Sequence, residues 1–381
     1  MGGAKGKDLW ELCSVPVPEL KQERYERLHS MMDAEGLDAL VVLASATLGR
    51  KGNLRYITNY GPPVSRYAGV VFPRHGDSVL FVPYAVHMAW AENITWAEDV
   101  RFSPDFPADV AAALWDRGYA SGHIGLVGQD TIVGFEQALA ERLPSIEITS
   151  ATASLTRLRM VKGPLETYLA RHAASMADQV FAEAASLIAD GATEAEIFAA
   201  GEARLRRLNS EECLLLIDSM GRPSMPIPSQ RAIAPGDLVQ YSVEPVSPGG
   251  HWIQSIRMFS RGEPSLPARR VIETFTESLS IAQAALGPGV PLSEVAGAIA
   301  EVLAPIAPRS HTPYGHGIGM DNFEPPLLSV DSDVVAEVNM IVVIHPVLIV
   351  EGRRFSLGDT YLVTEADAER LSQYPLELVV V

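Results

Sequence analysis

The chain has little cysteine and no long apolar run, and each absence excludes a class of protein. Only Cys13 and Cys213 occur in 381 residues, too few and too far apart for a disulfide framework or a cysteine metal site. No stretch approaches the roughly 18 apolar residues that a membrane helix needs, and the first residues lack the apolar core of a signal peptide. We therefore expect a cytoplasmic protein with no membrane partner.

Basic residues are scarce relative to acidic ones. The sequence holds 30 lysines and arginines against 47 aspartates and glutamates, which gives a net charge of -17. Because proteins that bind nucleic acid need a clustered basic surface, we expect no nucleic-acid partner. The composition, 47% hydrophobic and 20% charged, is that of a soluble globular protein, and the length predicts two domains.

Residues 1–156 are predicted to form an α/β domain. Short apolar runs bounded by turn residues are typical of buried strands, and helical segments lie between them. This alternation implies a sheet covered by helices. The expected strands are 37–45, 67–73 and 79–83, and the expected helices are 21–35 and 109–117.

Residues 157–381 are predicted to form an α+β domain. Pro164 suits the start of a long helix, where the missing N–H of proline costs nothing, and Gly191 ends that helix. Thr193 and Glu196 have the spacing of a capping box for a second helix. The later segments are expected strands at 213–218, 237–246, 252–259, 340–350 and 359–364, interrupted by helices at 269–286 and 292–306.

Six phrases of this second half resemble, in order, the motifs of the creatinase/prolidase/aminopeptidase P family. A further pair, NLRYITNY (53–60) and RYAGVVFP (66–73), resembles its first domain. The resemblance implies an α+β C-terminal pita-bread domain preceded by an α/β creatinase-like N-terminal domain, and a homodimer as the assembly. The six phrases are MVKGPLE (160–166), APGDLVQYSVEP (234–245), IQSIRMF (253–259), YGHGIGMDNFEPP (314–326), NMIVVIHP (339–346) and LGDTYLVTE (357–365).

The sequence departs from the family at the metal ligands. Peptidases of the family hold two metal ions with two aspartates, one histidine and two glutamates. Carried over by the resemblance, the aspartates are Ser242 and Gln254, the histidine is His316, and the glutamates are His345 and Gly358. Because hard divalent metals need several carboxylate oxygens, we expect no metal and no cofactor.

Three residues are the predicted catalytic groups. His316 lies in the glycine-flanked phrase GHGIG, where a neutral imidazole could act as acid or base near pH 7, or serve as a hydrogen-bonded structural residue. His345 occupies a former ligand position, so we expect it to face the same cavity. There it is either a catalytic group or a packed residue that fills the space of the lost metal. Glu244 follows Ser242 by two residues and shares its strand face, which makes it a replacement carboxylate or a surface residue.

Five residues are predicted to bind substrate. Arg66 matches an arginine that creatinase-type enzymes send from the first domain to a substrate carboxylate across the dimer, and a guanidinium holds a carboxylate in a two-pronged fork. Gln254 and Ser242 are neutral groups that suit a polar substrate. Arg257 is either a second anion contact or a structural partner, and Glu324 either completes a mononuclear iron site with the two histidines or supports a turn.

Three further positions have expected structural settings. His251 follows the turn PGG, which favours a solvated loop residue. Asp359 keeps a family aspartate and is expected to brace the site. A histidine that the family carries in another loop aligns with Met225.

These residues predict a metal-independent, creatinase-like enzyme that hydrolyses a C–N bond in a small carboxylate-bearing nitrogen compound by histidine acid/base catalysis. A metal-free lyase, decarboxylase or cyclase on the same fold is one alternative. A non-catalytic binding or scaffold protein is another, because the metal carboxylates are lost. A metallopeptidase is the third.

Overall fold

The computed structural model describes residues 18–64, 66–128, 132–222, 227–306 and 313–381. The chain separates into two units, residues 1–159 and residues 160–381. None of the helices in the described ranges combines the length and apolar content that crossing a membrane requires.

The first unit is built around a six-stranded mixed sheet in the order β4-β3-β2-β1-β5-β6. Its central strands β1 (Ala39–Ala44) and β2 (Ala68–Pro73) are buried along their whole length, which explains their continuous apolar sequences. β1 runs antiparallel to β2 and parallel to β5. The other strands are β3 (Val79–Val82), β4 (Asp99–Phe102), β5 (His123–Val127) and β6 (Glu147–Ser150).

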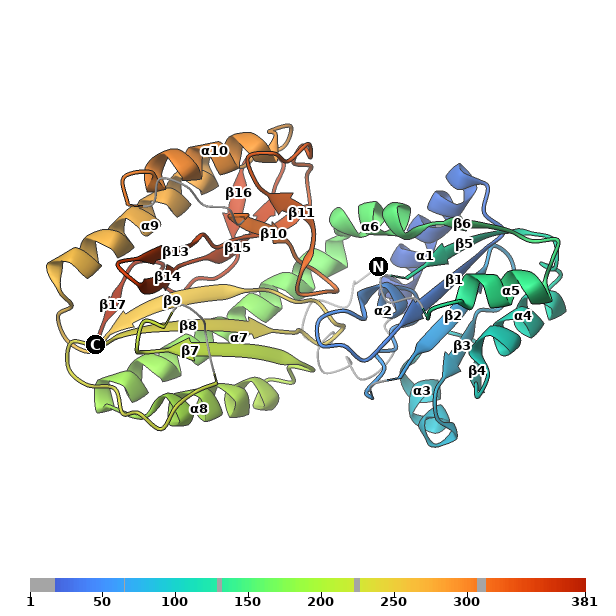
Figure 1. Ribbon diagram of the computed structural model, residues 1–381, viewed down its shortest axis with the longest axis horizontal. Coiled ribbons are helices and arrows are strands. Elements are labelled where there is room, and N and C mark those ends of the chain that lie inside the picture. Colours follow the sequence, from blue (N-terminus) through green and yellow to red (C-terminus); the bar gives the residue numbers. More distant parts are fainter. Residues whose placement is uncertain (1–17, 65, 129–131, 223–226, 307–312) are drawn as a thin grey trace, which may run out of the picture. The chain divides into compact units, whose positions relative to one another are not determined.

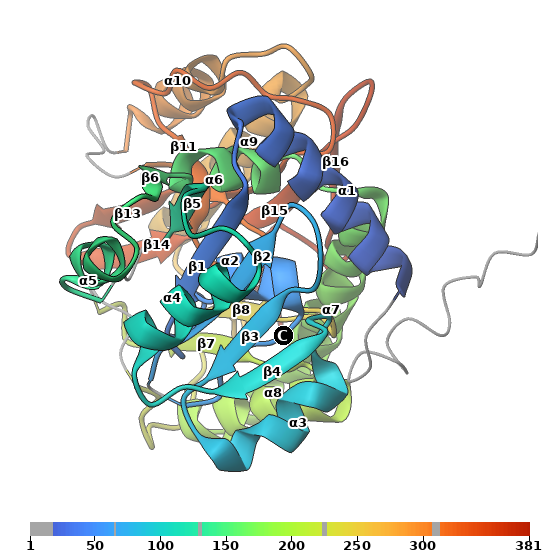
Figure 2. The same ribbon diagram turned by 90° about the vertical axis from the view of Figure 1, so that its right-hand side faces the viewer.

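Helix α4 (Phe106–Asp116) packs on this sheet through an apolar cluster, as the view onto the first unit shows (Figure 2). The contact requires a glycine, because a Cβ atom at Gly69 in β2 would lie 2.4 Å from the ring of Phe106. The remaining helices are α1 (Pro18–Glu35), α2 (Gly52–Thr58), η1 (Ala85–His87), α3 (Met88–Ile94), α5 (Phe135–Arg142) and α6 (Thr152–Met160).

The second unit opens with two helices whose ends follow from local sequence signals. Helix α7 (Pro164–Asp190) has proline in its first turn, and Gly191 follows it in the left-handed conformation with φ 78°. At the start of α8 (Glu194–Arg207), the Thr193 hydroxyl accepts a hydrogen bond from the backbone N–H of Glu196 at 3.2 Å. The predicted capping box is confirmed.

These helices lie against a four-stranded sheet in the order β17-β9-β8-β7 (Figure 1). β8 (Leu238–Pro245) is buried along its whole length and pairs antiparallel with both β7 (Cys213–Asp218) and β9 (Ser255–Ser260). The short β17 (Val379–Val380) pairs with β9 in parallel.

A second layer contains a five-stranded sheet in the order β11-β10-β12-β15-β16 and the hairpin β13–β14. Helices α9 (Leu266–Ala285) and α10 (Leu292–Leu303) cover its apolar core (Figure 1). The strands are β10 (Gly315–Gly317), β11 (Glu324–Leu328), β12 (Ile341–Ile344), β13 (Val347–Val350), β14 (Arg353–Ser356), β15 (Asp359–Val363) and β16 (Ala368–Arg370).

The single strand expected at 340–350 is wrong, because the structure divides it. β12 belongs to the five-stranded sheet, whereas β13 pairs only with β14 among the described strands. Pro346 lies at the break, where it has no N–H to donate to a sheet partner.

Candidate functional site

His316 is held by two glycines that let neighbouring strands approach closely. A Cβ atom at Gly315 would lie 2.0 Å from the carbonyl oxygen of Val343, and one at Gly317 would lie 2.2 Å from that of Pro325. The GHGIG phrase therefore fits a histidine tightly between β11 and β12. The His316 side chain is buried, with 5% of the residue exposed.

The two predicted histidines lie together. His316 Nδ1 donates to the carbonyl of Gly317 at 2.8 Å, which leaves Nε2 with its lone pair. The ring of His316 lies 5.0 Å from that of His345 and 4.3 Å from that of Phe323. Burial lowers the pKa of His316, and burial together with nearby His316 and Arg354 lowers the pKa of His345 to about 3. Both imidazoles are therefore neutral at pH 7.

Glu244 is a buried carboxyl group, so the surface alternative is wrong. Only 4% of the residue is exposed, and the Ser242 hydroxyl donates to Oε1 at 3.1 Å. The side chain of Asn322 forms a further hydrogen bond, yet burial raises the pKa of Glu244 to about 7. Asn322 precedes Phe323, so one turn contacts both Glu244 and His316.

The remaining former ligand positions converge through strand pairing. Ser242 pairs with Ile256 across β8 and β9, and Ile256 forms an isolated bridge with Gly358. Gln254 is fixed by its backbone, because its N–H donates to the Thr360 hydroxyl at 3.0 Å and its carbonyl accepts from that hydroxyl at 2.8 Å. The fold thus brings together the positions that the resemblance assigned to one centre.

The described residues do not fit the paired-metal centre of the family. No group of three or more histidine, cysteine, aspartate or glutamate side chains within the described ranges could hold a metal ion. A side chain at Gly358 is also blocked, because its Cβ atom would lie 2.4 Å from the Cβ atom of His345. Met225, aligned with another family histidine, lies outside the described residues.

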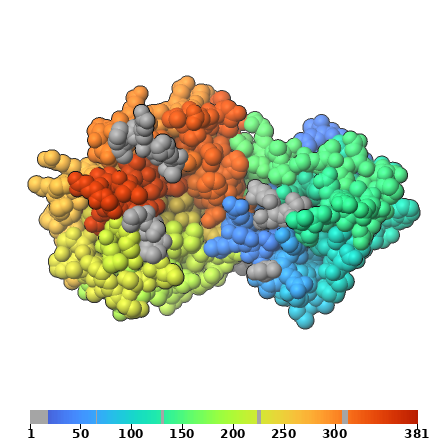
Figure 3. All heavy atoms as spheres, in the orientation of Figure 1, coloured from blue at the N-terminus to red at the C-terminus, as the bar shows by residue number. Residues whose placement is uncertain are grey.

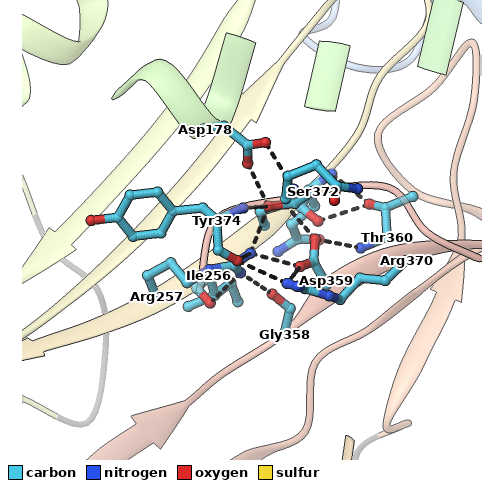
Figure 4. A network of polar contacts seen from close by, with 12 residues as sticks. Asp178, Ile256, Arg257, Gly358, Asp359, Thr360, Arg370, Ser372 and Tyr374 are labelled. Carbon is cyan, nitrogen blue, oxygen red and sulfur yellow. Dashed lines mark hydrogen bonds and ion pairs between the residues drawn. The ribbon is translucent and has the colours of Figure 1, made fainter. Parts of the chain in front are cut away.

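Arg257 lies in a buried polar network rather than at an open surface (Figure 4). Its Nη2 atom contacts Asp359 Oδ2 at 2.7 Å, with no exposed side-chain area on either residue. Arg257 also donates to the Gly358 carbonyl and the Ser372 hydroxyl, and Arg370 adds a second ion pair to Asp359. This setting favours the structural alternative for Arg257 and suits Asp359 as a brace; substrate contact by Arg257 stays a prediction.

Glu324 is the first residue of β11, directly after the bend at 321–323. Its Oε1 atom accepts from the backbone N–H of Asp321 at 2.8 Å, and its Oε2 atom lies 3.4 Å from the ammonium group of Lys162. Both ion-pair partners are nearly fully buried. This geometry favours turn support, and the two histidines and Glu324 do not form a candidate metal cluster among the described residues.

His251 is fully buried, so the expected solvated loop position is wrong. Its Nδ1 atom donates to the Trp252 carbonyl at 3.0 Å, and its Nε2 atom has no hydrogen-bond partner in the described part of the chain. Burial, followed by the positive charge of Lys162, lowers the pKa of His251 to about 4. Nothing in the PGG turn signals this burial, which comes from distant parts of the sequence.

Arg66 is an exposed residue of the first unit. Its guanidinium lies 5.3 Å from the centre of the Tyr84 ring, and both residues line a cavity of about 790 Å³ with Tyr67, Phe102 and Ser103. It forms no ion pair within the described part of the chain. Its predicted role at a carboxylate stays a prediction.

Comparison with known proteins identifies the family. Residues 169–365 match Metallopeptidase family M24, and residues 24–161 match the Creatinase/Prolidase N-terminal domain. The chain belongs to metallopeptidase family M24. The predicted two-domain pita-bread fold is confirmed.

Three similar proteins illustrate this membership. The "Uncharacterized hydrolase/peptidase y4tL" of Sinorhizobium fredii is 30% identical over 63% of this chain and 64% of its own length. The "Probable dipeptidase PepE" of Mycobacterium bovis is 30% identical over 61% of this chain and 63% of its own. The matches thus span less than two thirds of these relatives. The prolidase structure from Pyrococcus horikoshii OT3 has a TM-score of 0.79, with 21% identity over 94% of this chain and 100% of its own.

These names contradict the function predicted from sequence. The relatives are called peptidase, dipeptidase and prolidase, not creatinase, and nothing among them supports a metal-independent enzyme. The hypothesis of a metal-independent, creatinase-like enzyme for a small nitrogen compound is wrong. The loss of the metal-binding carboxylates does not by itself indicate a creatinase-like substrate, because the relatives of this chain are named as peptidases.

Proposed function

We propose that this chain is a hydrolase that cleaves the amide bond of short peptides, with Glu244 as the group that transfers protons. The observation that carries the proposal is a buried carboxyl with a pKa of about 7, beside the family's histidine turn. A general base works best when its pKa lies near the working pH. The peptidase names of the relatives support the class of substrate.

Glu244 has a simple role in such a reaction. As a carboxylate, it accepts a proton from the water molecule that attacks the peptide carbonyl carbon. When the C–N bond breaks, it returns that proton to the leaving amine. The Ser242 hydroxyl and the Asn322 side chain both hydrogen-bond to this carboxyl group and hold it in place for that role.

The test is a panel of dipeptides, including X-proline dipeptides, assayed by mass spectrometry. It is run without added metal, with chelator, and with manganese, cobalt or zinc. We expect turnover that rises through about pH 7 as Glu244 ionises. We expect Glu244→Gln to lower kcat/KM by about 100-fold or more, the usual contribution of a general base.

Glu263→Gln is the matched control, because the Glu263 side chain is 78% exposed in an ion pair with Arg269. It should keep the activity of the natural chain. Absence of dipeptide cleavage under every metal condition would overturn the proposal. So would equal activity of the two glutamine variants.

A further inference from the structure

The β13–β14 hairpin has one face in the apolar core. The opposite face carries Arg354 and Ser356 beside Val347 and Ile349, and is called the polar face below. Val347 pairs with Ser356, and Ile349 pairs with Arg354. Directly opposed residues of an antiparallel pair project to the same side, so Arg354 and Ser356 share a face. Phe355, between them, projects to the other face and is buried in the apolar core.

His345 lies next to this polar face. It precedes Val347 by two residues in the sequence. It also packs against Gly358, which follows Ser356 by two residues, because a Cβ atom added at Gly358 would lie 2.4 Å from the His345 Cβ atom. Arg354 is also close enough for its positive charge to act on the His345 ring. The polar face of the hairpin therefore continues to the histidine pair.

Three polar atoms on this face lack a hydrogen-bond partner. They are His345 Nε2, Arg354 Nη1 and Ser356 Oγ; all three are buried, and none has a partner among the residues that the structure describes. Arg354 also forms no ion pair with any residue that the structure describes. Its nearby acid, Asp218, is engaged by the backbone N–H of Gly221 at 2.6 Å and by Arg222 Nε at 2.6 Å.

Burying these unpaired polar atoms beside a positive charge costs folding free energy unless an anion binds to them. A partly buried guanidinium without a counter-charge loses hydration and gains no ion pair. An oxyanion supplies both the charge and several acceptor oxygens, and a guanidinium binds it through parallel N–H bonds. The hairpin forms part of the outer face of the second unit (Figure 3).

We propose that Arg354, Ser356 and His345 form a binding site for an oxyanion, a carboxylate or a phosphate, beside the position where the family holds its metals. Arg354 supplies the positive charge of this oxyanion site. The bulk charge of -17 disfavours non-specific anion binding, so measured affinity would report a specific site. The site does not depend on the proposed peptidase activity, because the test measures binding alone.

The experiment is isothermal titration of the full chain at pH 7.5. The probes are inorganic phosphate, N-acetylalanine and N-acetylalanine amide. We expect one oxyanion to bind and Arg354→Gln to weaken its affinity by about tenfold or more, the value of a charge-assisted hydrogen bond. Ser356→Ala should weaken it less, and Arg354→Lys should give an intermediate loss because it keeps the charge without the fork.

The matched control is Arg353→Gln. It removes the same charge one residue earlier, from a side chain that instead donates to the Leu238 carbonyl at 3.1 Å. Its affinity should stay within about twofold of the natural chain. Melting curves of every variant show that the fold is kept.

The probes separate the two sources of the anion. Tighter binding of N-acetylalanine than of its amide supports a peptide-type carboxylate. Binding of phosphate alone supports a free inorganic oxyanion. The proposal is overturned if neither oxyanion binds the natural chain at 10 mM, or if Arg353→Gln weakens binding as much as Arg354→Gln.

Discussion

At the scale of single residues, Glu244 links the proposed chemistry to stability. Its pKa is about 7 in the folded chain against an ordinary value of 4.5, because burial disfavours the charged form. Below pH 4.5 both states hold the proton. Between pH 4.5 and 7 the unfolded chain releases it while the folded chain keeps it, so stability is lost as the pH rises.

We expect Glu244→Gln to remove this loss. At pH 8 the variant should be more stable than the natural chain by roughly 3 kcal/mol, the energy equivalent of the raised pKa. The difference should vanish at pH 4. Urea unfolding across this pH range measures it.

Comparing the two proteins cancels the opposite effect of His251, whose pKa is lowered to about 4 and whose stabilisation is lost as the pH falls below 6.5. A stability difference that does not change between pH 4 and 8 would show that Glu244 ionises normally. The sequence predicts the burial of Glu244 better than that of His251. Glu244 shares a strand face with Ser242, whereas the setting of His251 depends on Lys162 and other distant residues.

At the scale of elements, the packing of the His345 region against Gly358 fixes the junction between β12 and β15. A methyl group at position 358 would lie 2.4 Å from the His345 Cβ atom and 2.6 Å from the Ile344 carbonyl oxygen. We expect Gly358→Ala to destabilise the chain by about 1–3 kcal/mol, because overpacking forces the strands apart. Thermal and urea unfolding measure the change.

Gly297→Ala in α10 is the contrasting substitution. No atom of the described residues lies within 4 Å of its added methyl group, and alanine favours a helix over glycine by up to about 1 kcal/mol. That variant should be unchanged or more stable. Equal stability of the two variants would mean that Gly358 is not confined as the geometry indicates.

The same elements show what sequence predicts well. Helix ends were predictable at Pro164, Gly191 and Thr193 because capping is a local interaction between near neighbours. The division of 340–350 into two strands was not, because an apolar run does not reveal which sheet each half joins. Arg354 was missed for a similar reason, although the alternation around Phe355 could have signalled a polar face.

At the scale of the whole molecule, the resemblance predicts a homodimer in which Arg66 acts on the partner's substrate. We expect sedimentation to give twice the chain mass of 41.1 kDa. In a two-fold dimer, mixing inactive Arg66→Gln and Glu244→Gln chains should restore about a quarter of the natural activity, because half of random pairs regain one intact site.

Two results would contradict this prediction. A species of 41.1 kDa at all concentrations would remove the partner. A mixture that stays inactive, with each variant folded, would show that Arg66 and Glu244 do not complement each other between chains. Neither result affects the binding test of Arg354, which concerns the second unit alone.

The short strand β17 lies at the edge of the four-stranded sheet and covers one side of β9. Val379 and Val380 pair with Phe259 and Ser260 of β9, and the backbone of Val381 bonds to Ser260 and Gly262. An uncovered strand edge offers unpaired backbone groups to strands of other molecules. Loss of Val379, Val380 and Val381 would leave the candidate site untouched and yet expose the edge of β9 as a template for aggregation.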